Sequence, residues 1–179
     1  MKPLIQIAEW IDKINEKLGY VAAVAVLLSC LISSLNAFIR YGFDYSSNGF
    51  LEIQWYMFAY VVMFGTAYVF KMNEHVRVDV LYGRLSTRKQ VWVDMFGITV
   101  FMLPVCAMMI YLSAPLFLKM FNSGEMSSNA GGLIRWPAMM ALPLGFSLLA
   151  LQGLSELIKR LGYVTGQYNM SINYEKPLQ

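Results

Sequence analysis

The sequence predicts an all-α integral membrane protein with four transmembrane helices and an N-terminal amphipathic interfacial helix. The first observation is composition: 58% of the 179 residues are hydrophobic and only 14% are charged, whereas soluble domains are about 45–50% apolar and about 25% charged. Mean hydropathy is +0.50 and the pI is about 8.8, yet the net charge is only +3. This composition disfavours a soluble enzyme, a disordered region and a nucleic-acid-binding protein.

The second observation is a set of long runs without any charged residue. They cover residues 18–39, 53–70, 95–118 and 136–155. A bilayer core of about 30 Å needs about 20 apolar residues in a helix, and lipid leaves backbone polar groups no other partner. We therefore expect one membrane domain over residues 1–179. Its spans lie at about residues 18–39, 51–70, 92–117 and 136–155, followed by a cytoplasmic tail at residues 156–179.

The third observation is the distribution of lysine and arginine. Eleven of the fourteen lie in the N-terminal segment, in the middle loop at residues 71–94 or in the tail, and only Arg40, Lys119 and Arg135 lie on the other side. The positive-inside rule then places both termini and the middle loop in the cytoplasm. No cleavable signal peptide is expected, because the first apolar run is too long and acids precede it.

The N-terminal segment at residues 3–17 is amphipathic at helical spacing. Its apolar residues are Leu4, Ile7, Ala8, Ile11, Ile14 and Leu18, and its polar residues are Gln6, Glu9, Asp12, Lys13, Glu16 and Lys17. This pattern predicts a helix that lies in the interface plane before the chain turns into the first span. A tail that is helical only in part, or a clamp onto a partner subunit, would use the same residues.

Local signals shape the middle loop and the third span. Valines alternate with Arg77 and Asp79 over residues 76–80, which indicates an extended segment, although a helical continuation is equally allowed. Ser86 predicts the N-cap of a helix that enters the third span. Pro104 and Pro115 are expected to kink that span or to loosen its ladder of hydrogen bonds.

The chain lacks the residues that several kinds of functional site require. His75 is the only histidine, and Cys30 and Cys106 lie separately inside apolar runs, so we expect no metal, no cofactor and no catalytic residue. No acid or base lies in the middle of a span, although coupled translocation pathways usually contain such groups. We expect neither an enzyme nor a pump or channel that acts alone.

Glu52 is the one acid close to a span. It would complement the positive end of the second helix, or it would anchor that helix against Arg40, Arg135 or a partner chain. The four tryptophans, Trp10, Trp55, Trp92 and Trp136, lie near the expected boundaries of water and lipid, as in an aromatic belt.

These residues carry a family resemblance over nearly the whole chain. Glu52 precedes Trp55 by three residues, Gly65 follows in the same span, and the stretch His-Val-Arg-Val-Asp-Val-Leu covers residues 75–81. The stretch Gly-Leu-Ile-Arg-Trp-Pro covers residues 132–137, and Pro-Leu-Gly covers residues 143–145. The sequence resembles the small membrane subunit (Q subunit) of tripartite ATP-independent periplasmic transporters.

The resemblance implies a non-translocating subunit of a bacterial inner-membrane transporter. In such systems a periplasmic solute-binding protein delivers an organic anion (a carboxylate, a keto or hydroxy acid, or a sulfonate), and a large multi-span subunit imports it with sodium by an elevator motion. The small subunit braces that mover and helps form the docking surface. Contacts with the large subunit or with phospholipid are expected at Glu52, Trp55, His75, Arg77 and Asp79. Docking contacts are expected at Arg40, Lys119, Arg135 and Trp136.

Two other functions stay open at this point. A membrane anchor of a redox complex would use His75 as a haem ligand, with the second ligand from a partner, and would show a visible absorption spectrum. A small multidrug exporter would use Glu52 as its coupling acid, although the position of Glu52 at the end of a span and the single charge orientation disfavour that function.

Overall fold

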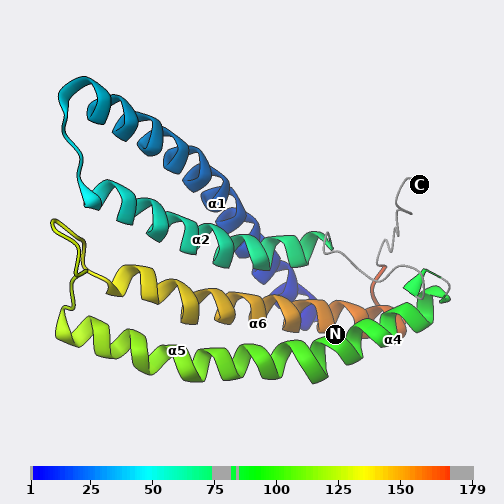
Figure 1. The fold of residues 1–179 in the computed structure, drawn as a ribbon. Coiled ribbons are helices and arrows are strands. Elements are labelled where there is room, and N and C mark those ends of the chain that lie inside the picture. Colours follow the sequence, from blue (N-terminus) through cyan, green and yellow to red (C-terminus); the bar gives the residue numbers. More distant parts are fainter. Residues whose placement is uncertain (1, 74–81, 84, 170–179) are drawn as a thin grey trace.

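The computed structural model describes residues 2–73, 82–83 and 85–169. In this part of the chain, helices account for almost all of the structure: α1 (Lys2–Phe43), α2 (Asn48–Met72), α4 (Thr87–Gly97), η1 (Ile98–Met102), α5 (Leu103–Ser123) and α6 (Trp136–Val164) (Figure 1). Helices α4, η1 and α5 form one continuous run, so four helical units are long and apolar enough to cross a membrane. The all-α class with four spans is confirmed.

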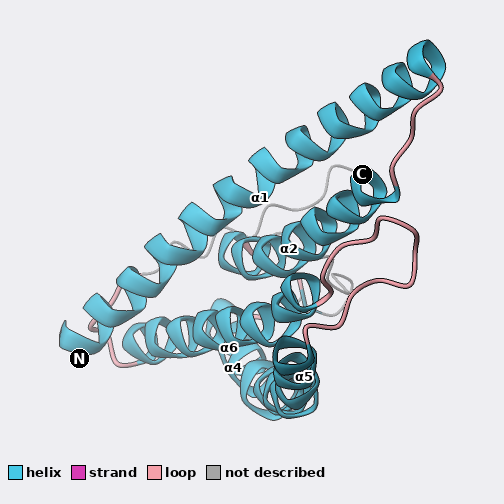
Figure 2. Ribbon diagram, turned by 90° about the vertical axis from the view of Figure 1, so that its left-hand side faces the viewer, coloured by secondary structure: helices cyan, strands magenta, loops and turns pink. Residues whose placement is uncertain are grey.

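The central element of the bundle is α6. It packs against α1, α2 and α5, and α1 also packs against α2. Helices α2, α5 and α6 run side by side, whereas α1 crosses them obliquely and its C-terminal half stands away from α2 (Figures 1 and 2). Residues 44–47 and the segment 124–135 lie at one end of the bundle, which we call the loop end. The N-terminus, α4 and the last turns of α6 lie at the other, the terminal end.

The core of the bundle is small, and large apolar side chains cover its outside. Ala22, Phe64, Ala67 and Leu148 form the buried cluster, while leucines, valines and phenylalanines on every helix are exposed. Since lipid is as apolar as these side chains, close backbone approach holds such helices together. One such approach occurs at Gly145, where an added Cβ would lie 2.4 Å from the Cβ of Met63.

The N-terminal segment differs from the expectation in one respect. It is helical, but α1 continues from Lys2 to Phe43 without a turn after Lys17. A helix of 42 residues is roughly 63 Å long, twice the thickness of a bilayer core, so part of it extends beyond the hydrocarbon. Ala8, Ile11 and Asn15 are buried, and Asp12, which was expected on the polar face, bonds to α6.

The helix of the fourth span extends into the segment expected as a cytoplasmic tail, residues 156–179. Helix α6 continues to Val164, and Glu156, Lys159 and Arg160 are buried. These charged residues ended the apolar run in the sequence, but the fold pairs Lys159 with Asp12 of α1 and Arg160 with Asp94 of α4, while Glu156 pairs with both cations within α6. The additional turns of α6 are the surface on which the start of α1 packs.

The third span contains a stretch of π-helix where a proline kink was expected. The N–H of Leu103 donates to the carbonyl of Ile98, five residues earlier, and Pro104 follows directly. In an α-helix the ring of Pro104 would clash with the carbonyl four residues before it, and the wider turn accommodates this. Pro115 lies inside α5.

The helix expected after Ser86 is confirmed: α4 begins at Thr87, and the N–H groups of Lys89 and Gln90 donate to the Ser86 carbonyl at 2.8 and 3.0 Å. The Ser86 side chain makes no capping hydrogen bond. The alternation expected over residues 76–80 lies outside the described residues.

Candidate functional site

A row of four polar side chains on α2 organises the loop end. Asn48, Glu52, Tyr56 and Tyr60 follow one another at intervals of four residues, which places them on one face of the helix. All four form hydrogen bonds with residues of the segment 127–137. This α2 polar row joins the second span to the connection between α5 and α6.

Glu52 makes the greatest number of these contacts. Its carboxylate accepts hydrogen bonds from the Ser127 hydroxyl, from Asn129 Nδ2 at 2.8 Å and from the backbone N–H of Leu133 at 2.6 Å. Only 3% of Glu52 is exposed. Hydrogen bonds to a charged acceptor are roughly twice as strong as neutral ones. Glu52 therefore contributes more than the other members of the row to holding the loop against α2.

The other three members of the row donate to backbone carbonyl groups. Asn48 Nδ2 donates to the carbonyl of Ala130 at 3.0 Å. The Tyr56 hydroxyl donates to the carbonyl of Ile134 at 2.8 Å, and the Tyr60 hydroxyl donates to that of Pro137 at 2.7 Å. These hydrogen bonds fix the path of the chain into α6, because they hold three successive points of it to one face of α2.

The segment 124–135 is itself a tight hairpin. The Ser127 N–H donates to the Leu133 carbonyl, and the Arg135 N–H donates to the Glu125 carbonyl, both at 2.9 Å. Gly131 has φ +70°, a conformation that other residues rarely adopt. An added Cβ on Gly132 would lie 2.6 Å from the Cβ of Ser127. The two glycines therefore permit the turn that delivers Ser127, Asn129 and Leu133 to Glu52.

A pocket of about 360 Å³ opens beside this junction. It is lined by Glu52, Trp55, Tyr56, Met120, Ser127, Ser128, Arg135, Ala138 and Met139. Trp55 is 64% exposed on the rim. Arg135 pairs with Glu125 at 2.7 Å; among the described residues, Glu52 forms no ion pair with Arg135 or with Arg40. Within the described residues, the loop supplies the hydrogen-bond partners of Glu52, where an arginine was one of the alternatives considered.

The four residues expected at a docking surface all lie toward the loop end. Trp136 packs against Phe121 and Phe117, with ring centroids 5.2 and 6.5 Å away. Arg135 is exposed next to it, Lys119 is exposed on α5, and Arg40 is exposed near the end of α1. Of the residues expected at a subunit or lipid contact, Trp55 is exposed and Glu52 is buried. His75, Arg77 and Asp79 lie outside the described residues.

A second polar group, at the terminal end, was missed in the sequence. Asp12 accepts hydrogen bonds from Gln152 and Ser155, both at 2.8 Å, and from Lys159 at 2.9 Å. Asn15 donates to Gln152 at 2.7 Å. Asp12 precedes the apolar run that begins at residue 18. Burial raises the pKa of Asp12, but the hydrogen bonds and the charge of Lys159 outweigh burial and hold this pKa below its ordinary value.

The same group continues from α6 to α4. Glu156 bridges Lys159 and Arg160, and Arg160 reaches Asp94 at 3.1 Å. We call the five charged residues Asp12, Asp94, Glu156, Lys159 and Arg160 the ionic cluster. It connects α1, α4 and α6, and removal of one member would leave a buried charge without its partner.

Some sequence signals for the two sites were present. The spacing of four residues from Asn48 to Tyr60 is present in the sequence and indicates one polar face of a helix. Glu156 stands three and four residues before Lys159 and Arg160, a spacing that predicts ion pairs on one helix. No local pattern connects Asp12 with Lys159, 147 residues away. In the described part of the chain, no group of three or more histidine, cysteine, aspartate or glutamate side chains could hold a metal ion.

Comparisons with known proteins give one result. The family model described as "Tripartite ATP-independent periplasmic transporters, DctQ component" matches residues 29–162, which include all of α2, α4, η1 and α5, most of α6 and about the last third of α1. Neither the comparison with curated proteins nor the comparison with solved structures found a match. Because the family model covers about three quarters of the sequence, the chain belongs to the DctQ component family of tripartite ATP-independent periplasmic transporters.

Proposed function

We propose that the chain is the small, non-translocating scaffold subunit of a binding-protein-dependent, sodium-coupled importer of organic anions such as carboxylates, keto or hydroxy acids, or sulfonates. It braces a large elevator-type subunit in the bacterial inner membrane, with both termini cytoplasmic. The loop end, facing the periplasm, forms part of the surface on which the solute-binding protein docks.

The observation that carries this proposal is the position of the charged groups. The four apolar runs contain no acid or base, and the buried charges occur at the two ends of the bundle, where the chain itself supplies their partners. Pathways that couple ion and solute movement across the hydrocarbon usually carry ionisable residues at mid-depth. The transport sites therefore belong to a partner.

The two polar sites fit a static brace. The ionic cluster fixes α1 and α4 to α6 at one end, and the α2 polar row fixes the segment 124–135 at the other. A fixed loop presents a docking partner with one conformation, which lowers the entropic cost of binding. The exposed apolar faces of the helices leave room for lipid and for the large subunit.

Reconstitution tests the proposal directly. Liposomes are prepared with the large membrane component alone, with this chain alone and with both, and uptake of a labelled organic anion is measured with binding protein and a sodium gradient. Uptake is expected only with both membrane chains. Accumulation of solute in vesicles that hold this chain alone would contradict the proposal, and so would full uptake by the large component alone.

A further inference from the structure

The start of α1 carries a hidden positive charge. Residues 2–17 contain three lysines (Lys2, Lys13 and Lys17) and three acids (Glu9, Asp12 and Glu16), so the segment is neutral as a sequence. Two of the acids pair with lysines outside the segment: Asp12 with Lys159 at 2.9 Å and Glu16 with Lys71 at 2.8 Å. They are therefore not available to neutralise the three lysines of the segment. Among the described residues, the three lysines take part in no ion pair.

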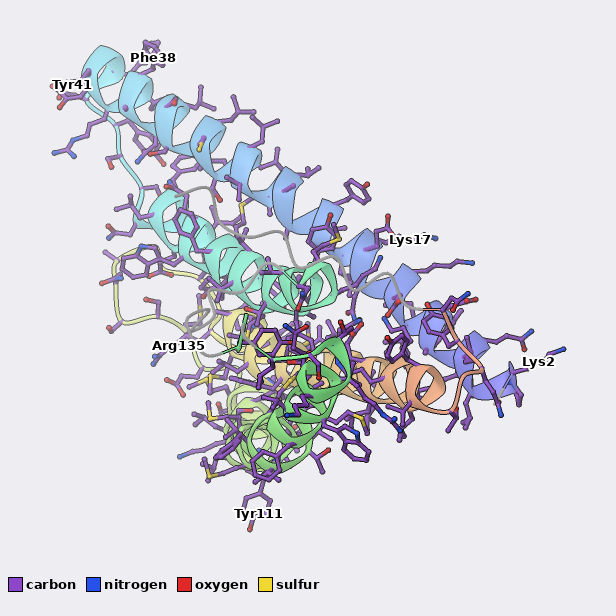
Figure 3. All side chains as sticks on the ribbon, turned by 90° about the vertical axis from the view of Figure 1, so that its right-hand side faces the viewer. Lys2, Lys17, Phe38, Tyr41, Tyr111 and Arg135 are labelled. Atoms are coloured by element: carbon purple, nitrogen blue, oxygen red, sulfur yellow. The ribbon has the colours of Figure 1, made fainter. Side chains whose placement is uncertain are left out.

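These lysines lie beside an exposed apolar strip. Ala8, Ile11 and Asn15 are buried in the bundle, while Leu4, Ile7 and Trp10 are 45%, 52% and 64% exposed. Lys2 and Lys17 point away from the other helices (Figure 3). The expected amphipathic stripe is thus divided: one part packs inside the bundle, and the other faces outward next to the unpaired lysines.

We propose that this outward face, formed by Leu4, Ile7 and Trp10 with Lys2, Lys13 and Lys17, binds the membrane surface and selects anionic phospholipid headgroups. Tryptophan favours the boundary between headgroups and acyl chains. Lysine places its methylene stem along apolar surface and its ammonium among the headgroups. Because Asp12 and Glu16 pair with lysines of other helices, Glu9 is the only acid of residues 2–17 left to balance the three lysines. An anionic headgroup supplies the negative charge that this face lacks.

The ionic cluster sets the orientation of this face. The Asp12 carboxylate is held by Lys159, and the Ser155 hydroxyl lies 3.1 Å from the carbonyl oxygen of Ala8. Helix α1 therefore cannot rotate about its axis, and it presents Ile7 and Trp10, rather than Ala8 and Ile11, to its surroundings. The inference concerns the lipid contact of this chain and does not depend on the proposed transport function.

Lipid selectivity in nanodiscs tests this inference. The full chain is placed in nanodiscs of phosphatidylglycerol and phosphatidylethanolamine, and the relative association constants of the two spin-labelled lipids are measured. The chain is expected to prefer phosphatidylglycerol. In the variant with Lys13→Gln and Lys17→Gln, the ratio of the two association constants is expected to fall on the order of fivefold for each lysine removed. Glu9→Gln should increase the preference. The matched control removes two charges at the loop end, through Arg40→Gln and Lys119→Gln.

A preference that changes less than the control variant's, or a parent chain without any preference, would overturn the inference. A second measurement tells whether lipid or a protein covers this outward face of α1. Nitroxide labels at Ile7→Cys and at Ile11→Cys, with Cys30 and Cys106 replaced, are tested for collision with oxygen, which concentrates in lipid. The label at position 7 should collide freely and the one at position 11 rarely. If the large membrane component protects position 7, a protein covers this face and the inference is wrong. Neither measurement depends on transport.

Discussion

The carboxylate of Glu52 and the backbone N–H of Leu133 are 2.6 Å apart, although 81 residues separate them in the chain. This hydrogen bond closes the loop end, because it joins the first turns of α2 to the residues that lead into α6. The carboxylate also receives Ser127 and Asn129. Five predictions follow from contacts of this kind and from the proposed function.

Glu52→Gln should release the segment 124–135. The amide has one acceptor oxygen, and its NH₂ group would face a donor in place of an acceptor. We expect faster proteolysis of the segment and roughly tenfold weaker docking of the binding protein, the effect of losing a charge-assisted hydrogen bond. Glu125→Gln is the matched control, because it removes the same charge from an exposed ion pair of the same loop. Equal effects of the two variants would contradict a special role for Glu52.

Lys159→Met should destabilise the whole terminal end. It leaves the carboxylates of Asp12 and Glu156 buried without their cation, which costs on the order of 3 kcal/mol in the free energy of unfolding. SDS titration of the purified chain measures this change. Lys17→Met is the control, because it removes the same charge from an exposed position on α1. Similar unfolding midpoints for both variants would show that the ionic cluster contributes little.

Gly145→Ala should disturb the contact of α6 with α2, because the new Cβ would lie 2.4 Å from the Cβ of Met63. Overpacking of this kind costs about 1–3 kcal/mol in the free energy of unfolding. Gly65→Ala is the control within a neighbouring helix, since an added Cβ there meets nothing within 4 Å, and we expect it to be neutral or stabilising. Thermal unfolding in one detergent compares the two, and a stable Gly145→Ala protein would refute the prediction.

Trp55→Ala should weaken recovery of the complex with the large membrane component and leave substrate preference unchanged. The side chain is 64% exposed, so the free energy of unfolding of the isolated chain should change by only about 0.5 kcal/mol. Trp92→Ala removes a similarly exposed indole near the other end and is the control. Pull-down yield and substrate competition in liposomes measure the two properties. A changed substrate preference would place Trp55 near the transport site.

The proposed orientation predicts where water-soluble reagents react. With Cys30 and Cys106 replaced, Ser128→Cys at the loop end should react with a membrane-impermeant maleimide in intact spheroplasts. Gln167→Cys at the terminal end should react only after lysis. Both parent side chains are exposed. Reaction of both cysteines in intact spheroplasts, or the opposite pattern, would reject cytoplasmic termini.

The spans were predictable because membrane helices depend mainly on local information. Each apolar run must satisfy its own backbone hydrogen bonds, so length and hydropathy alone indicate a helix. Family membership was likewise predictable from short motifs around Glu52 and around residues 132–137. The turn expected after Lys17 was wrong because the pattern of residues 3–17 cannot tell lipid from a neighbouring helix. In the fold, α6 covers the apolar stripe at Ala8, and Lys159 of the same helix pairs with Asp12 from the polar face.

By itself, the sequence determined that this chain has four runs long and apolar enough to cross a membrane, at which ends of the runs lysine and arginine gather, and that the runs contain no charged residue. These are properties of composition along single segments, and each is set by the energy of one segment in lipid. Only the tertiary structure decided that Glu52 bonds to the 124–135 segment, that Asp12 pairs with Lys159, and which lysines form no ion pair with another described residue. Hydrogen bonds and ion pairs act over a few ångströms in space, so residues far apart in the chain acquire their roles only when the helices have packed.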